Sequence, residues 1–170
     1  PELRDVQIGF DHGNPQTDAS GFGGFYFTSA YAYNIGVGFQ ANPHNFGRVW
    51  FPCKDNFTDR ALYDYNITVD TTKIAVCGGT LKNVTPNGDG TQTWHWKMAD
   101  DIPTYLASMA VSDYIAVTDT FISMTSDSIP VAIYVRPSDS AEAVGSFTRL
   151  QQCLTAFEDL FGPYRWERVG

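Results

Sequence analysis

The sequence predicts a mainly β fold: an antiparallel or mixed β-sandwich followed by one C-terminal amphipathic α-helix. Runs in which apolar and polar residues alternate recur over the first 136 residues, and this alternation is typical of half-buried strands. An Asn-Gly-Asp-Gly sequence at residues 87–90 separates two of these runs and predicts a hairpin. Beyond residue 137 apolar residues recur at steps of three and four, which indicates a helix with a single apolar stripe.

The expected strands follow in chain order. The first is the alternating run at residues 6–10, which ends at the turn residues 11–15. Glycines among the aromatics of residues 21–25 indicate bulges or close backbone approach, because the GxGxxG spacing of a phosphate-binding loop is absent. Residues 63–70 alternate without a break and predict an antiparallel strand with one solvent-exposed face. Later strands are expected at residues 73–77, 94–98, 105–117 and 129–135, and the last two, with apolar residues on both faces, are expected to be central.

The helix is expected to run through residues 140–161 without interruption. Asp139 or Ser140 can cap its N-terminus, and Glu142 stands three residues after Asp139, as in a capping box. Gly162-Pro163 is expected to end it. An apolar stripe of this length must pack on another surface.

Composition excludes several classes of protein. A net charge of −8 leaves no basic stripe for phosphates, so we expect no nucleic-acid partner. No apolar run is long enough to span a bilayer, so no membrane span is expected. The 170 residues suffice for one domain, or one domain with an appended piece. Because Pro1 is an unusual natural start, we expect the chain to be part of a longer protein.

Residues for metal binding or nucleophilic catalysis are sparse and scattered. A zinc peptidase needs two histidines four residues apart on a helix with a glutamate beside them, and His12, His44 and His95 do not have this spacing. No metal site and no catalytic residue are therefore expected in the chain. The three cysteines form no Cys-x-x-Cys pair and are expected to be buried free thiols: Cys53, Cys77 and Cys153.

The most informative stretch is residues 47–55, which combine large aromatics, a proline and an Arg/Asp pair. Trp50 is expected to enter the core, where its burial stabilises the fold by roughly 2–3 kcal/mol. Pro52 holds the preceding residue in an extended conformation. Arg48 and Asp55 are expected to pair across the resulting bend. This stretch is therefore either a structural clamp beside the core or a wall of a substrate cleft.

The same stretch resembles a known family. Its Arg-x-Trp-Phe-Pro-Cys-x-Asp pattern is similar to the signature in the N-terminal β-domain of the aminopeptidase N-like zinc metallopeptidases, the gluzincin aminopeptidases. Three later runs resemble family segments in the same order: residues 102–107, which include Tyr105, residues 129–134 and residues 157–164. The resemblance covers residues 46–170 well and residues 1–45 loosely.

This resemblance implies a saddle-like β-sandwich at residues 1–136, shortened at its start, and the first helix of the following catalytic domain at residues 137–170. The family's HExxH helix and its Gly-Ala-Met-Glu-Asn loop would lie beyond Gly170. The chain is therefore expected to be a non-catalytic fragment that forms part of the substrate-cleft wall. Zinc is expected in the missing catalytic domain. The implied partners are that domain and, in the full-length protein, a peptide substrate.

Gln40 is the substrate-binding residue that the resemblance implies. The family's β-domain lends the active site one Gln or Glu, shortly before the arginine of the signature, which binds the free amino group of the substrate. Counting back five residues from Arg48 gives Pro43, which cannot serve, whereas Gln40 can serve if the loop is longer. The alternative is that Gln40 is an ordinary exposed glutamine.

Two further expectations concern assembly and an alternative function. A sheet edge exposed near residues 5–10 or 60–70, or the apolar stripe of the helix, is expected to support a homodimer. The many aromatics on a β scaffold also fit a free-standing binding module for carbohydrate or protein. The helix at residues 140–161 argues against that alternative, because a self-contained sandwich does not need its apolar stripe.

Overall fold

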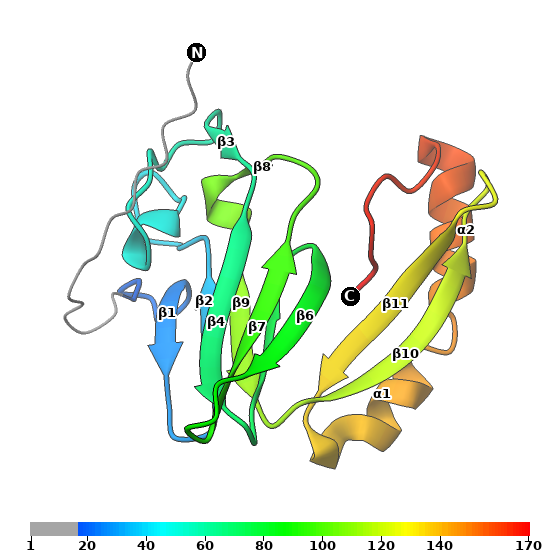
Figure 1. Cartoon of the computed structure of the whole chain (residues 1–170). Coiled ribbons are helices and arrows are strands. Elements are labelled where there is room, and N and C mark those ends of the chain that lie inside the picture. The colour runs from blue at the N-terminus through cyan, green and yellow to red at the C-terminus, as the bar shows by residue number, and fades with distance from the viewer. Residues whose placement is uncertain (1–16) are drawn as a thin grey trace, which may run out of the picture.

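The computed structural model describes residues 17–170, and within them the predicted mainly β fold is confirmed (Figure 1). Four strands form one antiparallel sheet in the order β1-β2-β9-β5, and three form a second in the order β4-β7-β6. The bounds of these strands are β1 Gly24–Phe27, β2 Ala32–Ile35, β4 Asp64–Asp70, β5 Ile74–Cys77, β6 Thr80–Pro86, β7 Thr91–Lys97 and β9 Met109–Ser112. Two short strands, β3 Arg60–Ala61 and β8 Ile102–Pro103, pair separately beside them.

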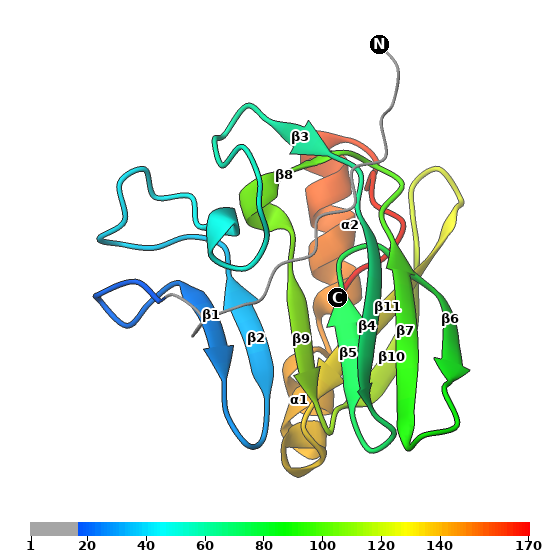
Figure 2. The ribbon, with the colours of Figure 1, turned by 60° about the vertical axis from the view of Figure 1, so that its left-hand side comes forward.

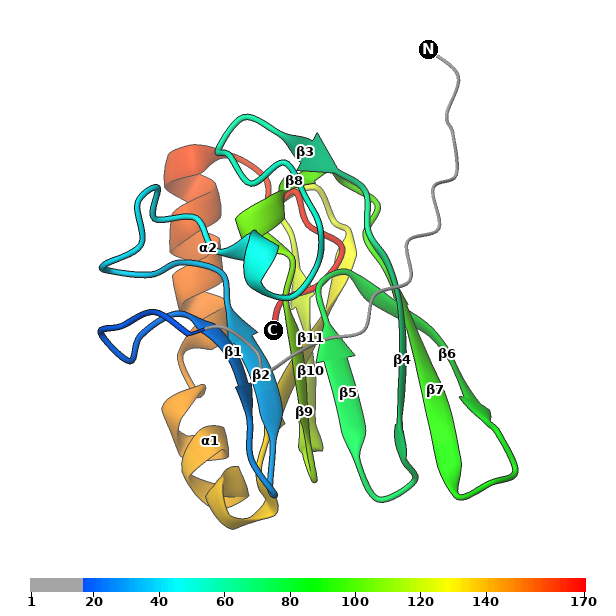
Figure 3. The same cartoon turned by 90° about the vertical axis from the view of Figure 1, so that its left-hand side faces the viewer.

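The first hydrophobic core lies between these two sheets. Its buried members come from both, with Tyr65 and Trp96 on the three-stranded sheet and Cys77 at the end of β5. Figure 3 shows β5 and β9 on one side of this packing and β4 and β7 on the other. The alternation predicted for residues 63–70 is confirmed, because Tyr65 is buried while the neighbouring residues of β4 face solvent. The Trp96 indole N–H donates to the Ala75 carbonyl at 2.9 Å, which joins the sheets by a buried hydrogen bond.

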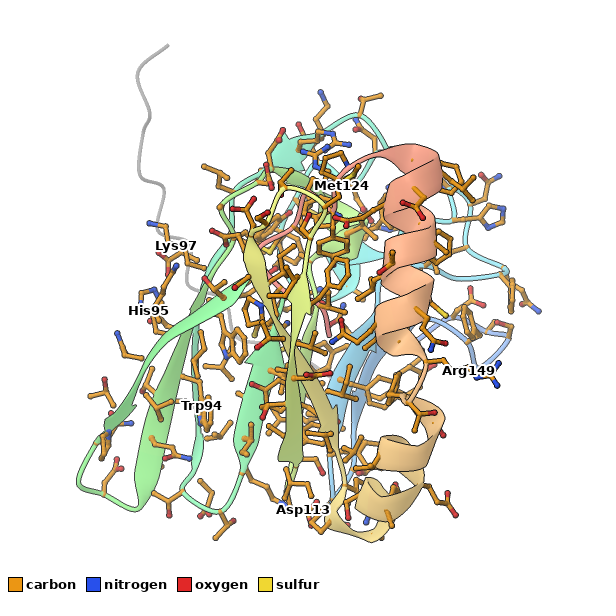
Figure 4. All side chains as sticks on the ribbon, turned by 90° about the vertical axis from the view of Figure 1, so that its right-hand side faces the viewer. Trp94, His95, Lys97, Asp113, Met124 and Arg149 are labelled. Atoms are coloured by element: carbon orange, nitrogen blue, oxygen red, sulfur yellow. The ribbon has the colours of Figure 1, made fainter. Side chains whose placement is uncertain are left out.

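The predicted hairpin at residues 87–90 is also confirmed, and it connects β6 to β7. Gly88 and Gly90 have φ values of +81° and +87°, a left-handed conformation that glycine adopts at low cost. Asp89 accepts the Thr91 backbone N–H at 3.0 Å and so fixes the end of the turn. The register then places polar residues of β7 opposite polar residues of β4. Figure 4 shows His95 and Lys97 on the outer face of this sheet.

A second core is built by the C-terminal part of the chain. Strands β10 Ile115–Ile122 and β11 Ser128–Val135 form a hairpin of their own, and the helices α1 Ser140–Ser146 and α2 Leu150–Phe161 lie along it (Figure 1). The buried residues of this core are Phe121, Ile129, Val131 and Leu154. The Glu158 carboxylate on α2 is buried, and it accepts the Ser123 hydroxyl at 2.5 Å and the Met124 backbone N–H at 2.7 Å. These bonds fix α2 against the loop of the hairpin, where Figure 4 labels Met124.

The expectation of two central strands, at residues 105–117 and 129–135, is corrected by the structure. Residues 104–106 form a 3₁₀ turn, η2, and the following residues divide into the central strand β9 and the largely exposed strand β10. β11 pairs with β10 in a two-stranded hairpin. Ile129 and Val131 on one face of β11 pack on α2, and the second edge of β11 bonds the C-terminal segment at Val169 instead of a further strand. A short apolar run is compatible with either environment, so periodicity alone did not distinguish them.

The predicted C-terminal helix is present, but it is interrupted at residues 147–149. The Thr148 hydroxyl donates to the Gly145 carbonyl at 3.0 Å, and the Leu150 N–H bonds the Phe147 carbonyl in a tight turn. Such local bonds compete with helix hydrogen bonds, and Gly145 has low helix propensity. The capping box does not form, because Asp139 accepts the Ser138 hydroxyl at 2.7 Å and makes no cap bond. Helix α2 ends at Gly162, as expected.

Arg168 connects the two cores. It lies on the C-terminal segment that runs between the β10–β11 hairpin and the first sandwich (Figure 1). Its guanidinium donates to the Gly79 carbonyl at 2.9 Å and to the Cys77 carbonyl at 3.0 Å. The same group lies 4.9 Å from the centre of the Trp96 ring. The next residue, Val169, donates its backbone N–H to the Pro130 carbonyl and accepts the Ala132 N–H, both within β11. One short segment therefore contacts both cores.

We predict that Arg168→Ala lowers the free energy of unfolding by roughly 2–4 kcal/mol, because two carbonyls lose a charged donor and Trp96 loses its cation. Urea unfolding followed by tryptophan fluorescence measures this change. Arg165→Ala is the matched control. Arg165 is exposed, and its ion pair with Asp100 is long, at 3.5 Å. Its removal should therefore cost less than about 1 kcal/mol. Equal losses for the two variants would contradict the prediction.

Candidate functional site

The centre of the candidate site is the carboxylate of Asp55. Its side chain is 5% exposed, although that of its partner Arg48 is 39% exposed. One oxygen accepts the Arg48 backbone N–H at 3.1 Å and the Arg48 guanidinium at 2.9 Å, and the other accepts the Thr104 hydroxyl at 3.2 Å. Burial opposes ionisation of Asp55, but these donors and Asn45 outweigh it, so the pKa of Asp55 lies below its ordinary value. The expected Arg48–Asp55 pair thus forms, with the carboxylate as its buried member.

Asn45 closes the same cluster from the other side. It is fully buried, and its side-chain amide donates to the Asp55 main-chain carbonyl. The Arg48 guanidinium also donates to the Asn45 carbonyl. The sequence did not indicate Asn45 or Thr104 as partners, because nothing local distinguishes them from other polar residues. Thr104 lies 49 residues from Asp55 along the chain.

Tyr105 enters the site through its backbone and its ring. Its carbonyl lies so close to Gly36 that a Cβ added to Gly36 would overlap that oxygen. Gly36 therefore permits a close approach of two main-chain segments that a larger residue would prevent. The Tyr105 ring meets the Phe57 ring edge-on, with centroids 5.4 Å apart. Tyr105 thus fixes where the chain leaves β2.

The aromatic residues of the signature stretch pack beside the first core. Trp50 and Phe51 are half-buried, with ring centroids 4.9 Å apart in an edge-on arrangement. The Phe51 ring also meets the Tyr63 ring edge-on, with centroids 5.9 Å apart. Pro52 is exposed at the end of the bend. Burial raises the pKa of the Cys53 thiol to about 11, so this cysteine is protonated and unreactive at neutral pH.

Gln40 is exposed on the loop at residues 36–46, and this loop is closed at its base by the cluster just described. The Phe46 N–H donates to the Gly36 carbonyl at 2.7 Å, and Val37 pairs with Asn45 in an antiparallel bridge. Figure 2 shows the loop projecting from the sandwich beside the loop that precedes β1. The structure thus joins Arg48 and Asp55 in one cluster with Thr104, the residue before Tyr105, and places Gln40 at the far end of the loop that this cluster anchors.

The remaining candidates do not converge on a metal or a nucleophile. Residues 17–170 contain no group of three or more His, Cys, Asp or Glu side chains that could hold a metal ion. The His95 imidazole lies 2.6 Å from the Asp64 carboxylate on the outer face of the three-stranded sheet, while His44 contacts the Gly38 carbonyl. Cys53, Cys77 and Cys153 are free, as predicted, but only Cys77 is buried; Cys53 is half-buried and Cys153 is exposed on α2. His12 and the strand expected at residues 6–10 lie outside the described residues. Among the helices in the described part of the chain, none has the length and hydropathy needed to cross a membrane.

We predict that Asp55→Asn lowers the free energy of unfolding by about 1–3 kcal/mol at neutral pH, because a neutral amide cannot accept all three donors. The folded-state pKa of Asp55 lies below its ordinary value of 3.8, so its ionised form stabilises the fold above that pH. This contribution is lost as the pH falls through the folded-state pKa. The difference between wild type and variant should therefore shrink on acidification. Denaturant titrations from acidic to neutral pH measure it, with the exposed Asp101→Asn as control; a constant difference would refute the assignment.

Solved structures with the same fold include zinc peptidases. An M1 zinc metallopeptidase from Deinococcus radiodurans, crystallised as a mutant bound to a Tyr-Ser-Ala substrate, superposes with a TM-score of 0.76 at 21% identity, over 92% of this chain and 35% of that one. Legionella pneumophila aminopeptidase A in complex with aspartic acid gives a TM-score of 0.74 at 16% identity, over 85% of this chain and 17% of that one. At these identities the likeness establishes the fold.

Curated relatives share part of the sequence. Leucine aminopeptidase 2 of Vanderwaltozyma polyspora is 28% identical over 120 residues, which are 70% of this chain and 17% of that protein. Transcription initiation factor TFIID subunit 2 of Danio rerio is 27% identical over 85 residues, which are 49% of this chain and 7% of that protein. The chain therefore spans less than a fifth of the length of either relative.

A family match covers more than half of the chain. The sequence model described as the peptidase M1 N-terminal domain matches residues 12–106, a range that includes Gln40, the Arg48–Asp55 pair and Tyr105. This match and the solved structures confirm the resemblance to the aminopeptidase N-like metallopeptidases and the β fold that it implied. The chain belongs to the family of peptidase M1 N-terminal domains.

Proposed function

We propose that this chain is the non-catalytic β-domain segment of a zinc aminopeptidase, an enzyme that removes N-terminal residues from peptides. In this proposal the sandwich forms part of the substrate-cleft wall, and Gln40 binds the free amino group of the peptide. The side chains of residues 17–170 do not fit a zinc ion, because no three metal-ligating groups converge. Zinc is therefore assigned to a catalytic domain of the same polypeptide.

The observation that carries the proposal is how Gln40 is presented. Its side chain is exposed, while the main chain of its loop is held at two points: buried Asp18 accepts the Gln40 backbone N–H, and buried Asn45 bonds the Asp55 carbonyl at the base of the loop. The amide oxygen of glutamine accepts hydrogen bonds, and an α-ammonium group supplies three donors. A fixed acceptor beside a cleft can select peptides with a free N-terminus without any chemistry of its own. The family membership of the chain supports this role, which the motif resemblance first indicated.

The C-terminal helices support the second part of the proposal, a junction with the catalytic domain. Leu154 and Leu150 pack on the β10–β11 hairpin, but Leu160 and Phe161 at the end of α2 are 75% and 79% exposed. Exposed neighbouring side chains of this size mark an interaction surface. We assign this end of α2 to contact with the rest of the catalytic domain, whose first helix is expected within residues 137–170. The alternative is that a second copy of the chain covers this surface in a homodimer.

A binding module without peptidase activity is the second candidate function. The observation that favours it is the match to a relative whose name is that of a transcription initiation factor subunit. Exposed aromatics on the first sandwich, such as Phe27 and Phe39, provide surface for a carbohydrate or protein ligand. This candidate predicts that the full-length protein has no peptidase activity and that calorimetric titration finds a ligand. The next experiment separates the two.

We predict that the full-length protein containing this chain hydrolyses amino-acid 4-nitroanilides in a chelator-sensitive reaction and does not hydrolyse their N-acetylated forms. Gln40→Ala should raise KM about tenfold with a smaller change in kcat, because loss of one charge-assisted hydrogen bond weakens binding of the ammonium group. Gln152→Ala, at an exposed glutamine on α2, is the matched control.

The 170-residue chain with added zinc is the second control and should show no turnover. Turnover by this chain would contradict its assignment as non-catalytic. An unchanged KM for Gln40→Ala in an active enzyme would refute the role of Gln40. A full-length protein without hydrolytic activity would favour the binding module.

We predict that the double variant Leu160→Glu, Phe161→Glu destabilises the full-length protein by roughly 2–4 kcal/mol but changes the stability of the 170-residue chain by less than about 0.5 kcal/mol. The reason is that both side chains are exposed in the chain and become buried only against the catalytic domain. Thermal and urea unfolding of both proteins measure the effect. Sedimentation showing that the 170-residue chain is a dimer, which the double variant dissociates, would assign the surface to a homodimer instead.

A further inference from the structure

Asp18 links the two loops that project from the first sandwich. The loop at residues 17–23 precedes β1, and the loop at residues 36–46 follows β2 and carries Gln40 (Figure 2). Asp18 is 5% exposed, and carboxylates are rarely buried to this extent. Both of its oxygens accept the backbone N–H of Gln40, at 3.1 and 3.2 Å. A buried acidic side chain on one loop thus holds the main chain of the candidate substrate-binding residue on the other.

The other contacts of Asp18 fix the carboxylate itself. Ser20 donates to it through both its hydroxyl and its backbone N–H. Hydrogen bonds lower the pKa of Asp18 despite the opposing effect of burial; the largest contribution is from the Ser20 hydroxyl, and the backbone N–H groups of Gln40, Ser20 and Ala41 add to it. Asp18 is therefore ionised at neutral pH and accepts charge-assisted bonds from the Gln40 loop.

Two glycines permit the close approach of the two loops. A Cβ added to Gly38 would lie 2.9 Å from the nearer Asp18 oxygen, and a Cβ added to Gly23 would overlap the Val37 carbonyl. The chain can therefore approach this closely only with glycine at both positions. At the outer ends of the loops the rings of Phe22 and Phe39 stack, with centroids 4.6 Å apart. Gln40 thus follows directly after a residue held by this stack.

We propose that Asp18 is a positioning residue for Gln40: its buried carboxylate fixes the Gln40 backbone so that the side-chain amide meets the α-amino group of the peptide. This inference rests on the proposed function of Gln40. Asp18 does not contact the substrate, so it acts through the conformation of the loop. Removing its charge should weaken recognition of the free amine and leave the chemical step unchanged.

The experiment compares Asp18→Asn with Ser20→Ala in the full-length protein. The amide introduced by Asp18→Asn has a similar shape but only one accepting oxygen, whereas Ser20→Ala removes a donor to Asp18 and leaves both bonds to Gln40. Hydrogen exchange of the Gln40 backbone amide, measured by NMR, should accelerate about tenfold or more in Asp18→Asn and little in Ser20→Ala. With a free-amine anilide, KM of Asp18→Asn should rise about five- to tenfold while kcat stays within about twofold.

A double-mutant cycle tests whether Asp18 acts through Gln40. If it does, adding Asp18→Asn to Gln40→Ala should change KM no further. Unchanged exchange of the Gln40 amide in Asp18→Asn would overturn the inference, as would a further KM increase in the double variant or a fall in kcat equal to the rise in KM. If Gln40→Ala alone leaves KM unchanged, the proposed role of Gln40 fails, and the positioning role fails with it. The exchange measurement then still shows whether Asp18 holds the loop.

Discussion

The buried carboxylate of Asp55 is the interaction on which the site depends. It gathers donors from Arg48 on one side of a bend and from Thr104, 49 residues later in the chain, on the other. A buried charge is stable only when its oxygens are satisfied, so these donors must occupy fixed positions. The Asn45 side-chain amide donates a hydrogen bond to the Asp55 carbonyl, and the Asn45 main chain pairs with Val37 at the base of the Gln40 loop. Asp55 therefore gathers the cluster through its buried carboxylate and, through its main-chain carbonyl, also bonds the base of a loop that extends into solvent.

The C-terminal unit, which comprises β10, β11, α1 and α2, is attached to the first sandwich by a different set of interactions. Its hairpin and helices share no sheet with the first sandwich, and their own core lies around Phe121 and Leu154. Arg168 bonds the carbonyls of Cys77 and Gly79 and lies over Trp96, so within residues 17–170 its guanidinium contacts dipoles and a ring instead of a carboxylate, and its buried Nη1 has no hydrogen-bond partner. A planar guanidinium fits this combination, whereas an ammonium would satisfy it less well. Trp96 in turn bonds the Ala75 carbonyl, so this contact continues into the centre of the sandwich.

Sequence patterns correctly predicted the features that depend only on residues close together in the chain. The alternation at β4, the Asn-Gly-Asp-Gly hairpin and the helix end at Gly162 depend on neighbouring residues, and all three are confirmed. The expectation of central strands holds for β9 but is wrong for β10 and β11, because apolar runs do not specify their partner. The expectation of an uninterrupted helix was wrong, because Thr148 competes for a helix carbonyl. The Arg48–Asp55 pair was predicted from charge, but Asp18 was missed, since its bonds to Gln40 join residues 22 apart. The boundary between residues 136 and 137 stays a prediction.

Under the proposed function, the rigidity of the Gln40 loop explains how this domain contributes to substrate selection without a chemical step of its own. A loop that becomes ordered only on binding loses conformational entropy at that moment, which weakens affinity. The main chain around Gln40 is held before any ligand arrives, by Asp18 at the tip and by the Asp55 cluster at the base. An amide on such a loop can bind an ammonium group with little reorganisation. Gly38 permits the contact with Asp18, because a side chain at this position would crowd the carboxylate. This residue of the loop is therefore explained by the conformation of the loop and not by contact with a ligand.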